Sequence, residues 1–502
     1  KNKKKEKSLE KPKKISKLKK SLKKEKTKPV TFVRLCKNLD ECDIDEISKI
    51  IMEMGKEKPF PDITIQWYMK NKKINIAIVG LGNIGTYLYD RLKKNKKIIK
   101  EKTNVNLEIK YISAKNKSKK RRIKIPKSKW LKSYIEASYK KDIDIVVELI
   151  GGAEGAAKRL VFNSIKNKKH VVTANKALIS KYGDQLAKLA EEKKVNLEYE
   201  AAVAGGIPII RTLKEGLIAN KINKICGILN GTSNYILSNM EKMTMDFKSV
   251  LSKAKELGYA ESNPESDLNG EDVKSKIQIL SALAFSSFIN KSKINVEGIK
   301  NVDQIDIRNA DLLGYKIKHL GVAEIESGKL IQRIHPCLVE KDSYISNVND
   351  VLNAIIVEGK PIGKFVIQGE GAGPGATTSA LVSDICSILR GNIKFPFLVS
   401  NKNRKKISSL DLSDKIFSFY IRLDVIDKKG VLSSITKIMS KNKISVKRLI
   451  QNPFRGKKYA SIIMISHKTK NFNLVKCINE LEKKNFILNK PKFIRIEKFW
   501  NL

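Results

Sequence analysis

Long apolar runs are missing from this sequence, and aromatic residues are scarce. No stretch approaches the roughly 18 apolar residues that a membrane-spanning helix needs, so we expect no membrane partner. The first residues are lysine-rich, without the apolar segment and cleavage site of a secretory signal, which favours a cytoplasmic location. Aromatic residues make up 7% of the chain, which provides few platforms for stacking nucleic-acid bases.

Cysteine and histidine are also sparse. The six cysteines and four histidines are scattered, without the spacing that ligands of a structural zinc ion show. We therefore expect reduced thiols and no zinc site.

Lysine is abundant, and the formal net charge is +49. It is spread over every segment rather than gathered in one patch, so we predict solvated surfaces and no nucleic-acid partner. Residues 1–30 are the exception, because they contain almost nothing that could enter a core, and we expect a disordered tail. We expect residues 31–72 to form an N-terminal extension of unknown role, with a strand at 31–35 and a helix at 43–54.

At 502 residues the chain is long enough for several domains. The run Ile74–Val79 is almost entirely apolar, as in a strand buried on both faces of a parallel sheet. Alternating strands and helices predict an α/β, Rossmann-type doubly wound parallel sheet over residues 73–200. The expected strands are 74–79, 107–113, 143–150, 170–173 and 197–200, and the expected helices are 86–94, 130–140, 156–166 and 182–193.

Beyond residue 200 the pattern changes twice. Longer helices mixed with strand-like stretches at 329–339, 353–358 and 364–368 indicate an α+β domain. A basic linker at 396–412 precedes residues 413–502, where the order βαββαβ predicts a ferredoxin-like domain. Its expected strands are 417–425, 446–450, 459–466 and 492–497, and its helices are 431–441 and 473–484.

A glycine-rich loop follows the first strand of the parallel sheet. Gly80 allows a tight turn, Gly82 lets the backbone approach a pyrophosphate, and Gly85 lets helix and strand pack closely. Together with Asn83 and Ile84 this loop predicts a dinucleotide site. The second strand ends without an acidic residue to bind the ribose of NAD, whereas Lys115 could face the 2′-phosphate of NADP, so the choice between NADP and NAD stays open.

Two further motifs carry polar groups suited to catalysis. Lys176 follows a short strand at the carboxyl edge of the sheet, where it is either a surface charge or an active-site cation. Asp272 and Lys276 are four residues apart, on one face of a helix that becomes apolar at Ile277. An ordinary surface ion pair is the alternative, but the carboxylates gathered at 261–272 suit the oxidation of an amino alcohol.

Several of these segments together resemble the homoserine dehydrogenase family. The likeness covers about residues 74–395 and is most specific in Leu229-Asn-Gly-Thr-Ser-Asn234 and in the block from Glu261 to Lys276. It implies an NAD(P)-dependent enzyme of amino-acid biosynthesis that interconverts L-homoserine and L-aspartate 4-semialdehyde on the route to threonine, methionine and isoleucine.

The resemblance also implies roles for individual residues. Lys276 would be the acid/base at the substrate hydroxyl, with Lys176 and Asp272 beside it, and Glu261 and Asp267 would bind the substrate. A lysine exchanges protons near neutrality only where burial or a second cation disfavours its charge. Asn263 departs from the aspartate that many relatives carry there, which puts a minor pocket interaction in doubt.

The family also suggests a bound cation and a segment that returns to the first domain. A sodium ion would be held by oxygens of Glu200, Val203, Gly205 and Ile207, and a plain interdomain turn is the alternative. Residues 201–369 would form the catalytic and dimerisation domain. About residues 370–395 would return to the dinucleotide domain and bring Gly371 near the cofactor.

The last ninety residues resemble an ACT regulatory domain. A ligand carboxylate could bind at the strand–helix junction formed by Asp427, Gly430, Val431 and Leu432. L-Threonine is the expected effector, and a homodimer or homotetramer is the expected assembly; the alternative is a domain that only holds subunits together.

Two rival functions remain open from the sequence. An aspartate semialdehyde dehydrogenase would need a cysteine nucleophile, but none of the cysteines lies in a suitable motif with a base. A binder of anionic surfaces would depend on the basic tail, and an enzyme would not.

Overall fold

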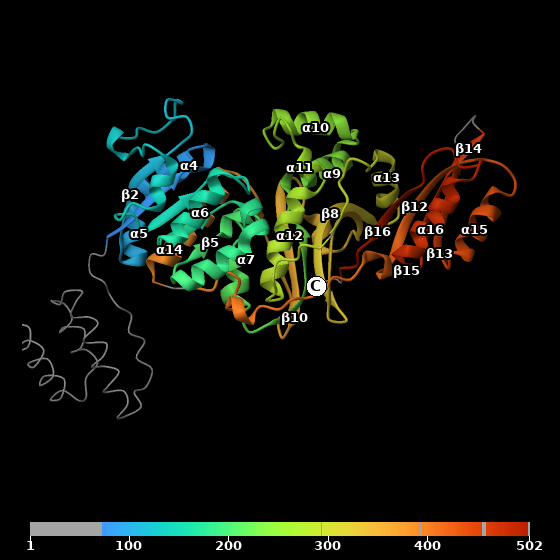
Figure 1. The fold of residues 1–502 in the computed structure, drawn as a ribbon. Coiled ribbons are helices and arrows are strands. Elements are labelled where there is room, and N and C mark those ends of the chain that lie inside the picture. Colours follow the sequence, from blue (N-terminus) through green and yellow to red (C-terminus); the bar gives the residue numbers. More distant parts are fainter. Residues whose placement is uncertain (1–72, 293, 392–393, 454–457, 500–502) are drawn as a thin grey trace, which may run out of the picture. The chain divides into compact units, whose positions relative to one another are not determined.

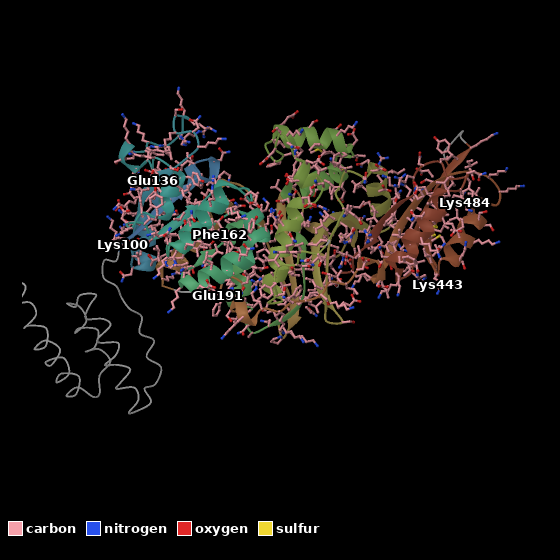
Figure 2. All side chains as sticks on the ribbon, in the orientation of Figure 1. Lys100, Glu136, Phe162, Glu191, Lys443 and Lys484 are labelled. Carbon is pink, nitrogen blue, oxygen red and sulfur yellow. The ribbon has the colours of Figure 1, made fainter. Side chains whose placement is uncertain are left out.

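The computed structural model describes residues 73–292, 294–391, 394–453 and 458–499, so the tail and extension expected in residues 1–72 lie outside the described residues. In the described part, no helix has the length and apolar character needed to cross a membrane. Charged side chains, Lys100, Lys443 and Lys484 among them, project from the ribbon in many directions (Figure 2). These three lysines lie on the surface in separate parts of the described chain.

A five-stranded parallel sheet forms the first part of the described chain (Figure 1). Its order is β2-β1-β3-β4-β5, which confirms the predicted Rossmann-like sheet. The central strands are apolar and almost wholly buried, since helices cover them. The strands are β1 (Lys73–Val79), β2 (Asn106–Ser113), β3 (Ile145–Glu148), β4 (His170–Thr173) and β5 (Leu197–Glu198).

The helices of this sheet include one from much later in the chain. In helix α14 (Pro374–Leu389), Leu381 and Ile385 share a core with Ile76 and Ile78 of β1. Helices α4 (Asn83–Lys94), α5 (Lys96–Thr103), α6 (Ala156–Lys166) and α7 (Lys176–Lys193) complete the set. Helix α7 starts six residues before the predicted helix at 182–193, because the Asn175 side chain caps it by accepting from the Leu178 N–H.

The predicted helix at 130–140 is wrong. This stretch holds only a short 3₁₀ helix, η3 (Tyr134–Ser138), begun by a capping box in which the Ser133 N–H donates to the Glu136 carboxylate at 2.8 Å. Residues Lys127–Lys129 form another, η2. The capping box fixes a single turn. The residues just beyond its C-cap, Lys140-Lys-Asp142, are all charged, so they provide no apolar face that would extend the helix.

A second, mixed sheet follows, with the order β11-β10-β6-β8-β9-β16-β12-β14-β13. Its first half is antiparallel except for the short β7, which pairs in parallel with β9. Helix α12 (Glu271–Ala284) packs against this half through Val273, Ile277 and Leu280. The strands of this half are β6 (Lys221–Ile228), β7 (Asn295–Val296), β8 (Tyr315–Glu326), β9 (Lys329–Glu340), β10 (Leu352–Lys360) and β11 (Gly363–Glu370). The other helices and turns are η4 (Glu200–Ala202), α8 (Ile209–Arg211), η5 (Thr212–Gly216), α9 (Gly231–Met243), α10 (Phe247–Glu256), α11 (Glu265–Leu268), α13 (Gln304–Leu312), η6 (Tyr344–Asn347), η7 (Asn401–Asn403) and η8 (Leu412–Asp414).

The C-terminal residues adopt the predicted βαββαβ order. The elements are β12 (Ile416–Ile426), α15 (Val431–Lys441), β13 (Val446–Pro453), β14 (Tyr459–Ser466), α16 (Asn471–Glu482) and β16 (Lys492–Ile496), with a short β15 (Thr469–Lys470) before α16. Strand β16 lies between β12 and β9, and it pairs in parallel with β9 through Arg495↔Cys337 and Ile496↔Leu338. The two halves therefore share one continuous sheet, which nothing in the sequence indicated.

Candidate active site

The glycine-rich loop lies between β1 and α4. A side chain at Gly80, which has φ +109°, would collide with the Leu149 carbonyl, and one at Gly85 would collide with the Gly80 carbonyl. Gly82 faces open space instead. It caps α4 without a side-chain hydrogen bond, and the first turn carries no acidic residue, so the N–H groups of Asn83 and Ile84 at the helix start are available to an anion. The loop fits the pyrophosphate of a dinucleotide.

A basic loop follows β2 beside this site. Lys115 is exposed there. Arg121, which sequence reasoning missed, donates from Nε to the Leu81 carbonyl at 3.2 Å and from Nη2 to the Asn116 carbonyl at 2.6 Å. Its guanidinium lies 5.5 Å from the Trp130 ring centroid. Arg121 thus ties the basic loop to the glycine-rich loop.

Polar contacts at the ends of β3 and β4 position Lys176. Glu148 is wholly buried and accepts from the Thr173 hydroxyl at 2.6 Å and from the Ile150 N–H at 2.7 Å. The Asn175 amide donates to the Gly152 carbonyl at 2.7 Å. These bonds fix the turn after β4, so that Lys176, the first residue of α7, points out of the sheet edge toward the second domain.

Asp272 is the centre of a buried cluster of charges. Its carboxylate lies 2.8 Å from Lys276 Nζ and 3.1 Å from Lys176 Nζ, and it accepts from Asn230 Nδ2 at 2.8 Å. Asp272 is 7% exposed and Lys276 9%. Burial opposes the charge of Asp272, but the two lysines and Asn230 outweigh it and hold the pKa of this carboxyl below its usual range. The structure thus brings together the three predicted catalytic residues.

Asn230 is a second residue that sequence reasoning missed. Its Oδ1 accepts from the Ser233 N–H at 2.8 Å, which caps α9 and fixes the orientation of the amide. Both hydrogens on Nδ2 are then directed to carboxylates, one to Asp272 and one to Asp267 at 2.8 Å. Burial raises the pKa of Asp267 against the opposing hydrogen bond from Asn230. Lys276 Nζ also donates to the Leu229 carbonyl at 2.6 Å, so this one turn orients every acidic and basic group of the cluster except Lys176.

Glu261 does not join the cluster. It is exposed in the loop between α10 and α11, and it has no hydrogen bond or ion pair with any residue that the structure describes. The structure therefore leaves its predicted contact with the substrate untested.

The residues predicted to hold sodium surround a buried turn. Glu200 is 3% exposed, and its carboxylate accepts from the N–H groups of Ile210 and Arg211, each at 2.8 Å. Burial raises the pKa of Glu200 to about 7. Val203 and Ile207 are buried in the same turn, and Gly205 is so close to Gly371 that a side chain at Gly205 would collide with the Gly371 carbonyl. Among the described residues, no three His, Cys, Asp or Glu side chains form a metal-binding group.

The predicted regulatory junction is accessible. Asp427 and Gly430 are exposed, and Gly430 has φ +85° and caps α15 without a side-chain hydrogen bond. Val431 is buried and Leu432 half-buried in the first turn of that helix.

The described cysteines do not suit nucleophilic catalysis. Cys226, Cys337 and Cys477 are buried and Cys386 is half-buried. Burial raises the pKa of Cys226 to about 12. A neutral, enclosed thiol is a poor nucleophile, which argues against the semialdehyde dehydrogenase alternative.

A dinucleotide loop and a buried lysine–carboxylate cluster, contributed by adjoining sheets, define a nicotinamide-dependent oxidoreductase. Residues 80–200 match the homoserine dehydrogenase NAD-binding domain, and residues 208–386 match homoserine dehydrogenase. A homoserine dehydrogenase of Neisseria gonorrhoeae is 38% identical over 433 residues, covering 85% of this chain and 99% of its own length. One of Helicobacter pylori is 38% identical over 426 residues, covering 85% and 99%.

A solved structure agrees with these relatives. The crystal structure of a homoserine dehydrogenase from Thiobacillus denitrificans superposes with a TM-score of 0.79 at 35% identity, and covers 85% of this chain and 99% of its own. The chain belongs to the homoserine dehydrogenase family. It is therefore an oxidoreductase of amino-acid biosynthesis with an NAD(P)-binding domain, and L-homoserine is the substrate that its family implies.

Proposed function

We propose that Lys276 is the proton-transfer group in the interconversion of L-homoserine and L-aspartate 4-semialdehyde. The observation that carries this proposal is the position of Asp272 between Lys276 on α12 and Lys176 on α7. Asp272 holds both ammonium groups at one point, where together they can face the substrate oxygen. When bound, the nicotinamide supplies the hydride acceptor or donor. In the reduction direction the Lys276 ammonium donates a proton to the carbonyl oxygen of the semialdehyde as the hydride reaches the carbon. In the oxidation direction Lys276 acts as the neutral amine and takes the proton of the substrate hydroxyl, and Lys176 stabilises the negative charge that develops on the oxygen.

Asp267 and Glu261 are proposed to bind the substrate amino group. Asp267 lies beside the cluster through Asn230, and Glu261 is on the exposed loop that precedes α11. An exposed loop can reach a substrate that enters from solvent.

The activity is tested directly. Purified protein supplied with L-homoserine should reduce NAD or NADP, which is measured as absorbance of the reduced cofactor. A folded sample that reduces neither would refute the proposed reaction. Running both cofactors in parallel also measures the preference, which we expect to favour NADP because Lys115 and Arg121 adjoin the glycine-rich loop.

A sodium ion is proposed at the turn formed by Glu200, Val203, Gly205 and Ile207. Each oxygen of the Glu200 carboxylate accepts one backbone N–H and keeps a lone pair, and the turn adds backbone carbonyls, so the donors suit a hard cation. Sodium chloride should then raise the melting temperature above that in choline chloride at equal ionic strength. Equal melting temperatures would argue against the ion.

We propose that the C-terminal domain is an ACT domain that binds L-threonine at Asp427 and Gly430. The βαββαβ order and the exposed, uncapped start of α15 support it. Asp427→Ala should weaken inhibition by millimolar threonine and leave turnover unchanged. Asp414→Ala, at an exposed ion pair with Lys470 in the same domain, should leave both the inhibition and the turnover unchanged. Full inhibition of the Asp427 variant would refute the site. Removing residues 405–502 is a poorer test, because it would also strip Glu497 from the buried Arg333.

The assembly is proposed to be a homodimer or a homotetramer. Strand β11 pairs only with β10 among the described residues, which leaves an open sheet edge in the catalytic domain. Light scattering on the purified protein would measure the mass, and a monomer would refute the proposal.

A further inference from the structure

A buried arginine of the C-terminal domain contacts the catalytic domain. Arg495, on β16, is 3% exposed, and its Nη1 donates to both carboxylate oxygens of Glu297 at 2.8 and 2.9 Å. Its Nε donates to the Asn471 side chain at 3.0 Å. Burial opposes the charge of Glu297, but Arg495 and the nearby His335 hold the pKa of that carboxyl below its usual range. Glu297 is thus held as an anion against β16.

Glu297 is also bound on its other side. Its backbone carbonyl is 3.0 Å from Nε2 of His319, a fully buried residue of β8. Burial lowers the pKa of His319 to about 4, so the ring is neutral near pH 7. Because a carbonyl can only accept, Nε2 carries the proton and Nδ1 is the acceptor. The Ser233 hydroxyl lies 3.4 Å from Nδ1 and 3.2 Å from the Asn230 carbonyl, and its one hydrogen is shared between these two acceptors.

Ser233 completes the connection to the charged cluster. Its N–H donates to Asn230 Oδ1, the bond that directs both Asn230 amide hydrogens to Asp267 and Asp272. A continuous series of polar contacts therefore runs from Arg495 through Glu297, His319 and Ser233 to Asn230.

We propose that Arg495 is a positioning residue for the dehydrogenase reaction, which fixes Asn230, and through it the Asp272–Lys276 pair, from the C-terminal domain. The inference rests on the proposed function of Lys276. Packed and hydrogen-bonded contacts of this kind can transmit a displacement between sites. A change in the position of β16 against β9 would move Glu297 and its backbone carbonyl. Asn230 would then lose the alignment that orients the carboxylates of Asp267 and Asp272.

The same domain contact offers a matched control. Arg422, on β12, is also buried, and it forms ion pairs with Asp306 and Asp303 near α13, each at 2.7 Å. Asp306 also accepts from the Tyr420 hydroxyl at 2.8 Å, and within the described residues no hydrogen bond or ion pair leads from this group to Asn230. Removing Arg422 weakens the attachment of the domain without breaking the contacts that end at Asn230.

The test compares Arg495→Gln with Arg422→Gln, using steady-state kinetics on L-homoserine and melting temperatures. Arg495→Gln should lower kcat by about three- to thirty-fold because it disturbs the Asp272–Lys276 pair, and it should also raise KM because Asn230 orients Asp267 as well. Arg422→Gln should keep kcat within about twofold of the wild type even if its melting temperature falls as far as that of Arg495→Gln. Arg495→Lys keeps the positive charge beside Glu297 and should therefore restore most of kcat. Equal losses of kcat in the two glutamine variants, or none in Arg495→Gln, would overturn the proposal.

A second variant keeps the proposal testable if Arg495→Gln fails to fold. Ser233→Ala leaves the domain contact intact and removes the hydroxyl that lies between His319 Nδ1 and the Asn230 carbonyl, while its N–H still donates to Asn230 Oδ1. It should lower kcat in the same direction, and wild-type kcat in Ser233→Ala would overturn the proposal. An inactive wild-type enzyme would instead refute the proposed reaction, so the two failures are distinguishable.

Discussion

Replacing Lys276 with alanine tests the chemistry of the charged cluster most directly. The change removes the Nζ that donates to Asp272 at 2.8 Å and to the Leu229 carbonyl at 2.6 Å. Loss of a proton-transfer group lowers turnover by about 10²- to 10⁴-fold. At about 1.4 kcal/mol for each factor of ten, this corresponds to roughly 3–5 kcal/mol of transition-state stabilisation.

The effect on folding should be smaller, because Asp272 keeps two partners. Lys176 remains 3.1 Å away, and Asn230 still donates at 2.8 Å. The carboxylate is therefore not left unpaired, which would cost about 3–5 kcal/mol. The Leu229 carbonyl loses one hydrogen bond, worth about 1 kcal/mol. We expect a folded enzyme whose melting temperature falls by at most a few degrees, because 1 kcal/mol corresponds to about 2–4 °C in a domain of about 150–250 residues and to less in a longer chain.

Lys274 is the matched control on the same helix. It forms an exposed ion pair with Glu271 at 3.0 Å, a contact worth at most about 1 kcal/mol. The assay follows reduced cofactor at saturating L-homoserine for Lys276→Ala, Lys274→Ala and the wild type. Turnover of Lys276→Ala within about threefold of the wild type, or an equal loss in Lys274→Ala, would refute the role of Lys276.

Three further changes probe other parts of the site. Glu261→Ala should raise the KM for homoserine by about tenfold with little change in kcat, since a carboxylate facing an ammonium contributes to ground and transition states alike; an unchanged KM would exclude that contact. Lys115→Ala should raise the KM for NADP by about tenfold and leave that for NAD unaltered, and equal shifts for both would remove its role at the 2′-phosphate. For His319, whose pKa burial lowers to about 4, folding stability should be intact above about pH 6.5 and decline as the pH falls toward 4, by up to about 3 kcal/mol. Urea unfolding at pH 7 and pH 4.5 should show a smaller decline in His319→Gln, and an identical decline would contradict the buried neutral ring.

The positions of individual strands and helices were easier to predict than the pairing between strands. Buried runs such as Ile74–Val79 and the C-terminal helix at 431–441 lie where the pattern placed them, because burial imposes a periodicity on the local sequence. The pairing of β16 with β9 has no such local record, since it depends on two segments far apart in the chain.

The residues of the site divide in the same way: local spacing predicted some of them, and only the fold revealed the others. The spacing of Asp272 and Lys276 predicted a shared helical face, which the structure confirms with a 2.8 Å ion pair. Asn230 was missed because an asparagine before a helix is explained by its cap, and its two carboxylate partners lie 37 and 42 residues away. Arg121 was missed among many lysines, because only the fold shows that it contacts the Leu81 carbonyl.

The place of β16 in the middle of the shared sheet affects how the protein can fold during synthesis. Strand β9 leaves the ribosome long before β16. Arg333 on β9 therefore has no ion pair with Glu497 until the residue after β16 has been made, although the two side chains lie 2.6 Å apart in the finished fold. Until then an edge of β9 is open to pairing with other chains. Translation that pauses before residue 492 would therefore prolong an aggregation-prone state, and the catalytic half can complete its sheet only when the C-terminal half completes its own.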